Sequence, residues 1–177
     1  MALLAACSGS THNAAPSTSS STSAASAATT SVSSTTTTLD EKEAVKTAYL
    51  AYWQMVDRLV HAPDPNDGAI ESLAEDPAAS VLRTALLNQI GRGEIRGLPA
   101  NAKYSHRVDA VTVDRSTASV LDCVVDDKVV FDREGNVRDD GVSTGRFKAE
   151  LVRRGARWLV RQVDLLEQAP GVSGCAA

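Results

Sequence analysis

The sequence predicts an α+β domain in which N-terminal helices pack on one face of an antiparallel sheet. A stretch with apolar residues at helical spacing comes first, between residues 40 and 61, and the runs rich in β-branched residues all follow Pro99. Helices and strands that are segregated along a chain are typical of α+β proteins, whereas alternation of the two indicates a parallel sheet. Each element, taken in order, agrees with this fold class.

The first predicted element is a long helix between Asp40 and His61. Its apolar residues recur at the spacing of one helix face. Asp40 and Glu43 match a capping box, so the helix is expected to begin at Asp40, and Pro63 is expected to end it. The predicted inner face consists of Val45, Tyr49, Tyr52, Trp53, Val56, Leu59 and Val60.

Two shorter helices are predicted next, at residues 67–75 and from Pro77 to about Ile90. In the second of them Asp76 and Pro77 form the expected cap and first turn. Glycines and Pro99 then close the helical half of the domain. The residues expected to face inward are Val81, Leu82, Ala85 and Leu86.

The remaining residues predict strands. Runs at 103–114 and 118–127 are joined by a turn at Arg115 and Ser116, and a shorter run, 128–132, precedes a polar loop at 133–141.

The last two predicted strands form a hairpin. In the run 146–152, Phe147, Ala149 and Leu151 alternate with charged residues, which predicts a strand with one buried face. Gly155 marks the turn into the final strand, which begins at Arg157.

The segment before Asp40 differs in composition from the rest of the chain. It contains no Asp, Glu, Lys or Arg, and most residues from Ser8 to Thr38 are Ser or Thr. Such a segment has little apolar surface to bury, so we expect a disordered tether, which could carry O-linked glycans, over residues 7–38. Residues 39–177 are long enough for one domain with one core.

Charge and hydropathy exclude two classes of function. The formal net charge is −4, and this mild acidity argues against a nucleic-acid surface, which requires a basic stripe or patch, so no nucleic-acid partner is expected. No run approaches the roughly 18 apolar residues of a membrane-spanning helix.

The sequence "LAAC" at residues 4–7 resembles the lipobox of bacterial lipoproteins. The resemblance implies that Cys7 carries a diacylglycerol and that the chain is cut between Ala6 and Cys7. Residues 1–6 lack the basic segment and the apolar run of a signal peptide, so they are expected to be the end of a truncated one. The alternative is a chance match in a cytosolic chain. On the lipoprotein interpretation, the lipid holds the protein to the cell membrane from outside the cytoplasm.

Two further cysteines lie in the domain, Cys123 in a predicted strand and Cys175 near the C-terminus. If Cys7 is lipidated, the three cysteines resolve into one anchor and one disulfide pair. A disulfide is consistent with export from the cytosol. The alternative is that Cys123 is a small buried apolar residue.

The order of elements resembles the nuclear-transport-factor-2-like (NTF2-like) superfamily, which includes ketosteroid-isomerase and SnoaL-like proteins. The phrase "GARWLV", from Gly155 to Val160, looks like the final hairpin of that family. More narrowly, the chain resembles small actinobacterial lipoproteins of this fold with one cysteine in the second long strand and another at the C-terminus. The resemblance implies a strongly bent, cystatin-like sheet that encloses a conical pocket with the first helix.

The same resemblance indicates which residues could line the pocket. Tyr49, Tyr52, Trp53 and Val56 lie on the helix face that would cover it, and Asp122 interrupts an apolar strand. In ketosteroid-isomerase-like enzymes a pocket carboxylate moves a proton while a phenol stabilises an oxyanion. Asp122 with Tyr49 or Tyr52 could take these roles. The alternatives are that the aromatic residues are core and that Asp122 points outward.

Other motifs do not meet the requirements of their chemistry. Ser143 lies in a G-x-S-x-G pattern, but no helix is expected after it and no histidine follows it in the chain. The loop with Asp132 and Asn136 lacks the glycine and glutamate that a calcium loop needs at its sixth and twelfth positions. No His or Cys spacing predicts a metal site, and no cofactor is expected.

A basic cluster on the last two strands is either a solvated face or a contact for anionic lipid or wall polymer. It consists of Arg146, Lys148, Arg153, Arg154, Arg157 and Arg161.

The sequence therefore predicts a cell-envelope lipoprotein whose domain is a binding or interaction module. The expected partners are the membrane, through the anchor, and a small apolar ligand or an envelope protein; a homodimer is an open alternative. The rival function is an isomerase or hydratase that uses Asp122 and a tyrosine. An open pocket that both side chains face would distinguish the two.

Overall fold

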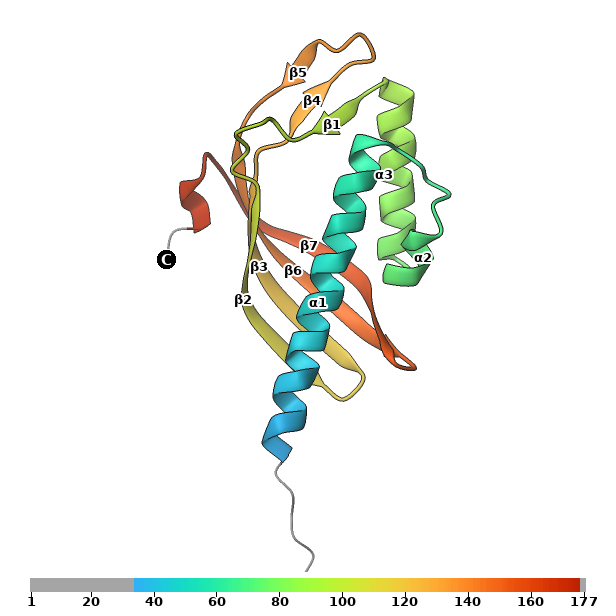
Figure 1. The fold of residues 1–177 in the computed structure, drawn as a ribbon, viewed down its shortest axis with the longest axis vertical. Coiled ribbons are helices and arrows are strands. Elements are labelled where there is room, and N and C mark those ends of the chain that lie inside the picture. The colour runs from blue at the N-terminus through green and yellow to red at the C-terminus, as the bar shows by residue number, and fades with distance from the viewer. Residues whose placement is uncertain (1–33, 176–177) are drawn as a thin grey trace, which may run out of the picture. The chain divides into compact units, whose positions relative to one another are not determined.

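Helix α1 (Ser34–His61) lies across the inner face of an antiparallel sheet (Figure 1). The computed structural model describes the backbone of residues 34–175 and the side chains of residues 40–174. The helix begins at Ser34, ahead of Asp40, so the predicted capping box at Asp40 and Glu43 is wrong and the boundary expected at residue 39 falls inside α1.

The predicted inner face of α1 is confirmed. Val45, Tyr49 and Leu59 are fully inaccessible to solvent, and Tyr52 is buried with them. The other three members, Trp53, Val56 and Val60, are partly buried against the same core. Met55, which the sequence did not single out, is buried as well.

Helices α2 (Ala69–Leu73) and α3 (Ala78–Arg92) pack beside α1. Leu82 and Leu86 of α3 are buried as predicted, but Val81 is 66% exposed and Ala85 is exposed too. The buried stripe of α3 instead runs through Ala78, Ala79, Leu82, Leu86 and Gln89, because the helix is rotated relative to the expected face. Gly93, with a φ of +67°, ends the helix in the left-handed conformation that glycine tolerates.

The main sheet has the strand order β2-β3-β6-β7 and is antiparallel throughout. Bulges interrupt the β2–β3 and β6–β7 ladders, and such bulges bend a sheet. The strands accordingly curve along their length beside α1 in Figure 1. The strand bounds are β2 Ser105–Asp114, β3 Thr117–Asp126, β6 Ser143–Arg154 and β7 Arg157–Pro170.

A second, small sheet has the order β1-β4-β5. Its strands are β1 (Ile95–Gly97), β4 (Val129–Phe131) and β5 (Val137–Asp139). β4 was predicted, whereas β1 and β5 were expected to be loop. The two missed strands have three residues each, which is too short for a recognisable alternation.

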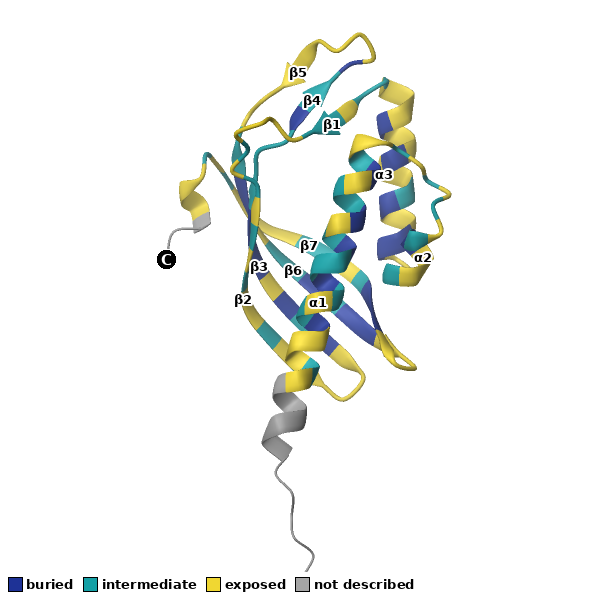
Figure 2. Cartoon of the chain, in the orientation of Figure 1, coloured by how far each residue is buried: buried dark blue, intermediate teal, exposed yellow. Residues whose placement is uncertain are grey.

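The core lies between the helices and the inner face of the main sheet (Figure 2). Val120 of β3, Ala149 and Leu151 of β6, and Val160 of β7 are fully inaccessible to solvent and meet the buried face of α1. The predicted α+β class, with helices on one face of an antiparallel meander, is confirmed. No helix in the described part of the chain combines the length and apolar character needed to cross a membrane.

The C-terminal segment folds back against the main sheet on the side away from α3 (Figure 1). The Thr144 hydroxyl donates a hydrogen bond to the carbonyl of Gly171. Gly174 lies so close that a Cβ there would be 3.0 Å from the Cβ of Thr144. The short 3-10 helix η1 (Ser173–Cys175) thereby contacts β3, β6 and β7.

Candidate functional site

Asp122 of β3 lies inside the domain. Residues alternate between the two faces of a strand, and Asp122 shares its face with the buried residues Val120 and Val124. Only 2% of Asp122 is exposed. Since a buried carboxylate is costly without hydrogen bonds, its partners define the site.

Two side chains meet at the same carboxylate oxygen. The Tyr49 hydroxyl, from α1, donates a hydrogen bond of 2.9 Å to Oδ2 of Asp122. Nδ1 of His106, from β2, lies 2.5 Å from the same oxygen. One carboxylate therefore joins α1, β2 and β3.

The hydrogen bonds continue outward from His106. Nε2 of His106 lies 2.8 Å from the Tyr104 hydroxyl, and this hydroxyl donates a bond of 2.8 Å to Oδ1 of Asp57. The ammonium of Lys128 lies 3.1 Å from the same oxygen of Asp57. These side chains, together with Tyr49 and Asp122, form what we call the buried polar chain: Tyr49, Asp122, His106, Tyr104, Asp57 and Lys128.

The number of available hydrogens sets the direction of these bonds. Tyr104 has one hydroxyl hydrogen, which goes to Asp57, so its oxygen accepts from Nε2 of His106. Asp122 accepts from Tyr49 and meets Nδ1 of His106 at the same oxygen. His106 therefore links Asp122 to Tyr104 through its two ring nitrogens.

Aromatic rings surround the inner part of the buried polar chain. The Trp53 ring lies 5.1 Å from that of His106 and 5.7 Å from that of Phe147, measured between centroids. Two buried polar atoms, Nε1 of Trp53 and Oδ1 of Asp122, have no hydrogen-bond partner among the described residues. The hydrogen bonds of Asp122 to described residues are thus those at Oδ2.

Burial changes the ionisation of all three tyrosines. It raises the pKa of Tyr49 well above its ordinary value of 10.0, and the Asp122 carboxylate raises it further. Burial, followed by the nearby Asp57 carboxylate, has the same effect on the pKa of Tyr104. Burial alone raises the pKa of Tyr52 to about 12. In each case the neutral phenol is favoured.

The structure brings together one of the two predicted Asp–Tyr pairs. Tyr49 contacts Asp122, whereas Tyr52 makes no hydrogen bond with any described residue. Of five cavities in the described part of the chain, none is lined by Tyr49, Tyr52, Trp53 or Val56, whereas one is lined by Asp122. Tyr49 and Tyr52 are core residues.

Sequence reasoning missed His106, Tyr104, Asp57 and Lys128. Two signals could have indicated them. Tyr104 and His106 alternate with exposed residues, as on one face of a strand, and Asp57 follows Tyr49 by eight residues, as on one face of a helix. Their meeting at Asp122 depends on the register between β2 and β3, which the sequence does not specify.

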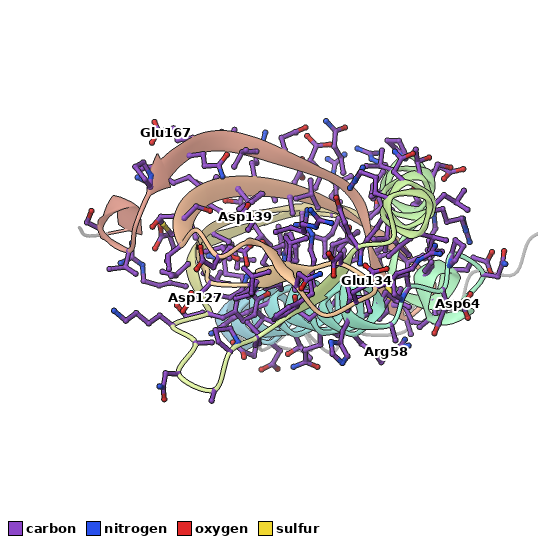
Figure 3. All side chains as sticks on the ribbon, turned by 90° about the horizontal axis from the view of Figure 1, so that it is seen from above. Arg58, Asp64, Asp127, Glu134, Asp139 and Glu167 are labelled. Carbon is purple, nitrogen blue, oxygen red and sulfur yellow. The ribbon has the colours of Figure 1, made fainter. Side chains whose placement is uncertain are left out.

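One cavity lies on the outer face of the main sheet. Leu121 is 39% exposed and, as the neighbour of Asp122, points away from α1. It lines a cavity of about 230 Å³ together with Asp122, Arg146, Phe147, Leu166 and Glu167. Figure 3 places Glu167 on the far side of the sheet from Arg58 of α1. Asp109, which also lines this cavity, pairs with Arg146 at 3.4 Å.

The cysteines are only partly within the described residues. Cys123 is buried and disulfide-bonded. Cys175 is the last residue of η1, but its side chain lies outside the described ones, and Cys7 lies outside the described residues altogether. Cys123 belongs to β3, the inner strand that η1 contacts.

Within the described part of the chain, no group of three or more His, Cys, Asp and Glu side chains could hold a metal ion. The loop at Asp132 is a hairpin between β4 and β5. Its carboxylate accepts hydrogen bonds from the backbone of Glu134 and Asn136 and pairs with Arg138. Ser143 begins β6, so a strand, and not a helix, follows it.

Comparisons with known proteins find a solved structure of similar fold but no matching family. No protein-family model matches the chain, and no curated protein matches it. Among solved structures, it is similar to the intermembrane space region of the chloroplast protein ARC6, with a TM-score of 0.57 and 15% sequence identity. The match covers 71% of this chain and 95% of that one, and at this identity it shows that the two domains share a fold.

Proposed function

We propose that the protein is a cell-envelope lipoprotein whose α+β domain is a binding or interaction module of NTF2-like fold. The helices that precede a bent four-stranded meander support the NTF2-like assignment. A lipid on Cys7 would hold the domain to the membrane, and residues 7–33 would act as the tether.

The proposal includes localisation of the domain outside the cytoplasm. The "LAAC" sequence and the Ser/Thr-rich segment support it. The disulfide at Cys123 supports it as well, because disulfides persist outside the cytosol. The similar solved structure is also a region from an intermembrane space.

The observation that favours binding over catalysis is the direct bond between Tyr49 and Asp122. An isomerase or hydratase would need the phenol and the carboxylate free to contact a substrate. Here the hydroxyl of Tyr49 is used by Asp122, and both residues are buried. This pair serves to hold α1 against the sheet.

A binding surface is instead offered by the outer face of the main sheet. Leu121 and Leu166 are exposed at 39% and 53%, and both line the cavity of about 230 Å³. Exposed leucines beside a concavity are typical of a site for an apolar group. The ligand class that fits is a small apolar molecule or an apolar side chain of an envelope protein.

Titration with N-phenyl-naphthylamine, an uncharged apolar dye, tests this proposal. Leu121→Gln and Leu166→Gln should each weaken dye binding by about tenfold, which corresponds to about 1.4 kcal/mol. Val81→Gln is the matched control, because Val81 is 66% exposed on α3, away from the cavity. Equal dye affinity in all three variants would reject the outer face as the binding surface.

A further inference from the structure

A second, smaller cavity lies at the outer end of the buried polar chain. It has a volume of about 140 Å³ and is lined by Asp57, His61, Arg96, Gly97, Leu98 and Lys128. These residues come from the end of α1, from β1 and the residue after it, and from the turn between β3 and β4. Three of these six residues, Asp57, Arg96 and Lys128, carry a charge.

Arg96 is the unusual member of this lining. Its guanidinium makes no hydrogen bond or ion pair within the described part of the chain, although Glu94 is near enough to be influenced by its charge. Two other described arginines, Arg115 and Arg157, also lack such a partner, but both are exposed, whereas Arg96 is half-buried. A half-buried guanidinium without an anion retains an uncompensated desolvation cost.

Lys128 provides a second donor. Its side chain is only 10% exposed, and its ammonium lies 3.1 Å from Asp57 and 3.2 Å from Asp126. It also lies 3.6 Å from the centre of the Tyr104 ring. An ammonium has three hydrogens, so after the two carboxylates a ligand would compete with the Tyr104 ring for the third.

The charges of the lining favour a monoanion. Lys128 pairs with Asp57 of the lining and with Asp126 beside it, so Arg96 is the charged lining residue that has no direct partner. A guanidinium binds a carboxylate through two parallel hydrogen bonds. Gly97 and Leu98 provide an apolar wall that can accept a short carbon chain.

We propose that this cavity binds a short-chain organic monocarboxylate, with the carboxylate between Arg96 and Lys128. The site is separate from the outer-face cavity and does not depend on the function proposed above. It is also connected to the core, because Asp57 forms an ion pair with Lys128 and accepts a hydrogen bond from Tyr104, and Tyr104 contacts His106. A ligand that accepts a hydrogen bond from Lys128 changes the electrostatic field at Asp57 and, through Tyr104, at His106.

The proposal is tested by NMR titration of the full chain with sodium propionate, with sodium chloride at equal ionic strength as the blank. We expect saturable shifts of the Arg96, Gly97 and Leu98 amides and of the His106 ring. Inorganic phosphate should bind more weakly, because its second charge is repelled by Asp57. Absence of saturable shifts with propionate would overturn the site.

Two variants localise the binding. Arg96→Gln removes the unpaired charge, and Gly97→Ala adds a Cβ that would lie 3.5 Å from Phe131 and 3.7 Å from His61, both ordinary contacts that the fold tolerates. Each should weaken propionate binding by about tenfold or more. Arg157→Gln is the matched control, with the same loss of charge at an exposed, unpaired arginine, and should bind as the unaltered chain does. Equal affinity in all three variants contradicts the assignment.

Tyr104→Phe tests the connection to the core. It removes the hydroxyl between Asp57 and His106 while leaving the cavity lining intact. Propionate should still bind, but the His106 ring should no longer respond. A persistent His106 response would refute the connection and leave the site itself supported.

Discussion

The Tyr49 hydroxyl on α1 donates a hydrogen bond of 2.9 Å to the carboxylate of Asp122 on β3, 73 residues further along the chain. Both residues are buried, and the carboxylate also meets His106 of β2. The carboxylate of Asp122 therefore links α1 to the inner strand β3 and to the edge strand β2. Its chemistry could belong to a catalytic pair, but its burial indicates a structural one.

Tyr49→Phe should destabilise the domain by about 1–3 kcal/mol, because it leaves a buried carboxylate with one donor fewer. Chemical denaturation of the purified protein measures this loss. Tyr52→Phe is the control, since Tyr52 is equally part of the core but makes no hydrogen bond with the described residues. If the two variants lose the same stability, the hydrogen bond to Asp122 contributes nothing.

Stability should fall steeply at alkaline pH. The pKa of Tyr52 is raised from 10.0 to about 12, so the contribution of this buried phenol is complete below pH 10 and is lost as the pH rises toward 12. Tyr49 and Tyr104, whose pKa values are raised as well, act in the same direction. Near-ultraviolet absorbance measures the formation of phenolate, and circular dichroism measures unfolding. We expect the two signals to change at the same pH. Phenolate in a folded chain near pH 10 would contradict the burial of these tyrosines.

Cys7→Ser should release the protein from the membrane fraction when the chain is expressed with a complete signal peptide. The lipid on Cys7 is proposed to hold the protein to the membrane, and no helix in the described part of the chain is long and apolar enough to span it. Fractionation followed by immunoblotting measures the change, with Cys175→Ser as the control that should remain in the membrane fraction. Unchanged fractionation of Cys7→Ser would remove the basis for the anchor.

Cys175 is the predicted partner of Cys123 in the disulfide. Peptide mapping without reduction should recover a linked peptide containing both residues, and Cys175→Ser should expose one thiol at Cys123 after unfolding. In the chain-entropy model, a bridge that closes a loop of about 50 residues stabilises the fold by about 4 kcal/mol. A linked peptide that joins Cys123 to Cys7 would disprove both this pairing and the lipidation of Cys7.

The elements predicted from the sequence are those with long, regular patterns. The face of α1 from Val45 to Val60 repeats over four turns, and a single orientation satisfies it. In α3, Val81 competes with Ala78 and Ala79 for the inner face. Small residues are buried there because they allow close packing, which an apolarity pattern does not reveal. β1 and β5 are held by pairing with β4, which local sequence does not encode.

The candidate site was predicted only in part, for a related reason. Asp122 was identified because a charge interrupts an apolar strand, and Tyr49 because of its helix face. His106 meets Asp122 through the register of β2 with β3, in which His106 pairs with Val124 and Val108 pairs with Asp122. Asp57 and Tyr104 come within hydrogen-bond distance only when α1 packs on the sheet. Such contacts are properties of the tertiary structure.

The bond between Tyr49 and Asp122 is proposed to be structural, and binding is proposed to occur on the outer face of the sheet. The most direct test is to measure unfolding free energy and dye affinity together in Tyr49→Phe and Leu121→Gln. Tyr49→Phe should lose about 1–3 kcal/mol of stability and keep its affinity for N-phenyl-naphthylamine, because Tyr49 does not line the cavity at Leu121. Leu121→Gln should keep its stability and lose dye affinity by about tenfold. The reverse result, with unaltered stability but abolished binding in Tyr49→Phe, would contradict this assignment and place the functional site at the Tyr49–Asp122 pair.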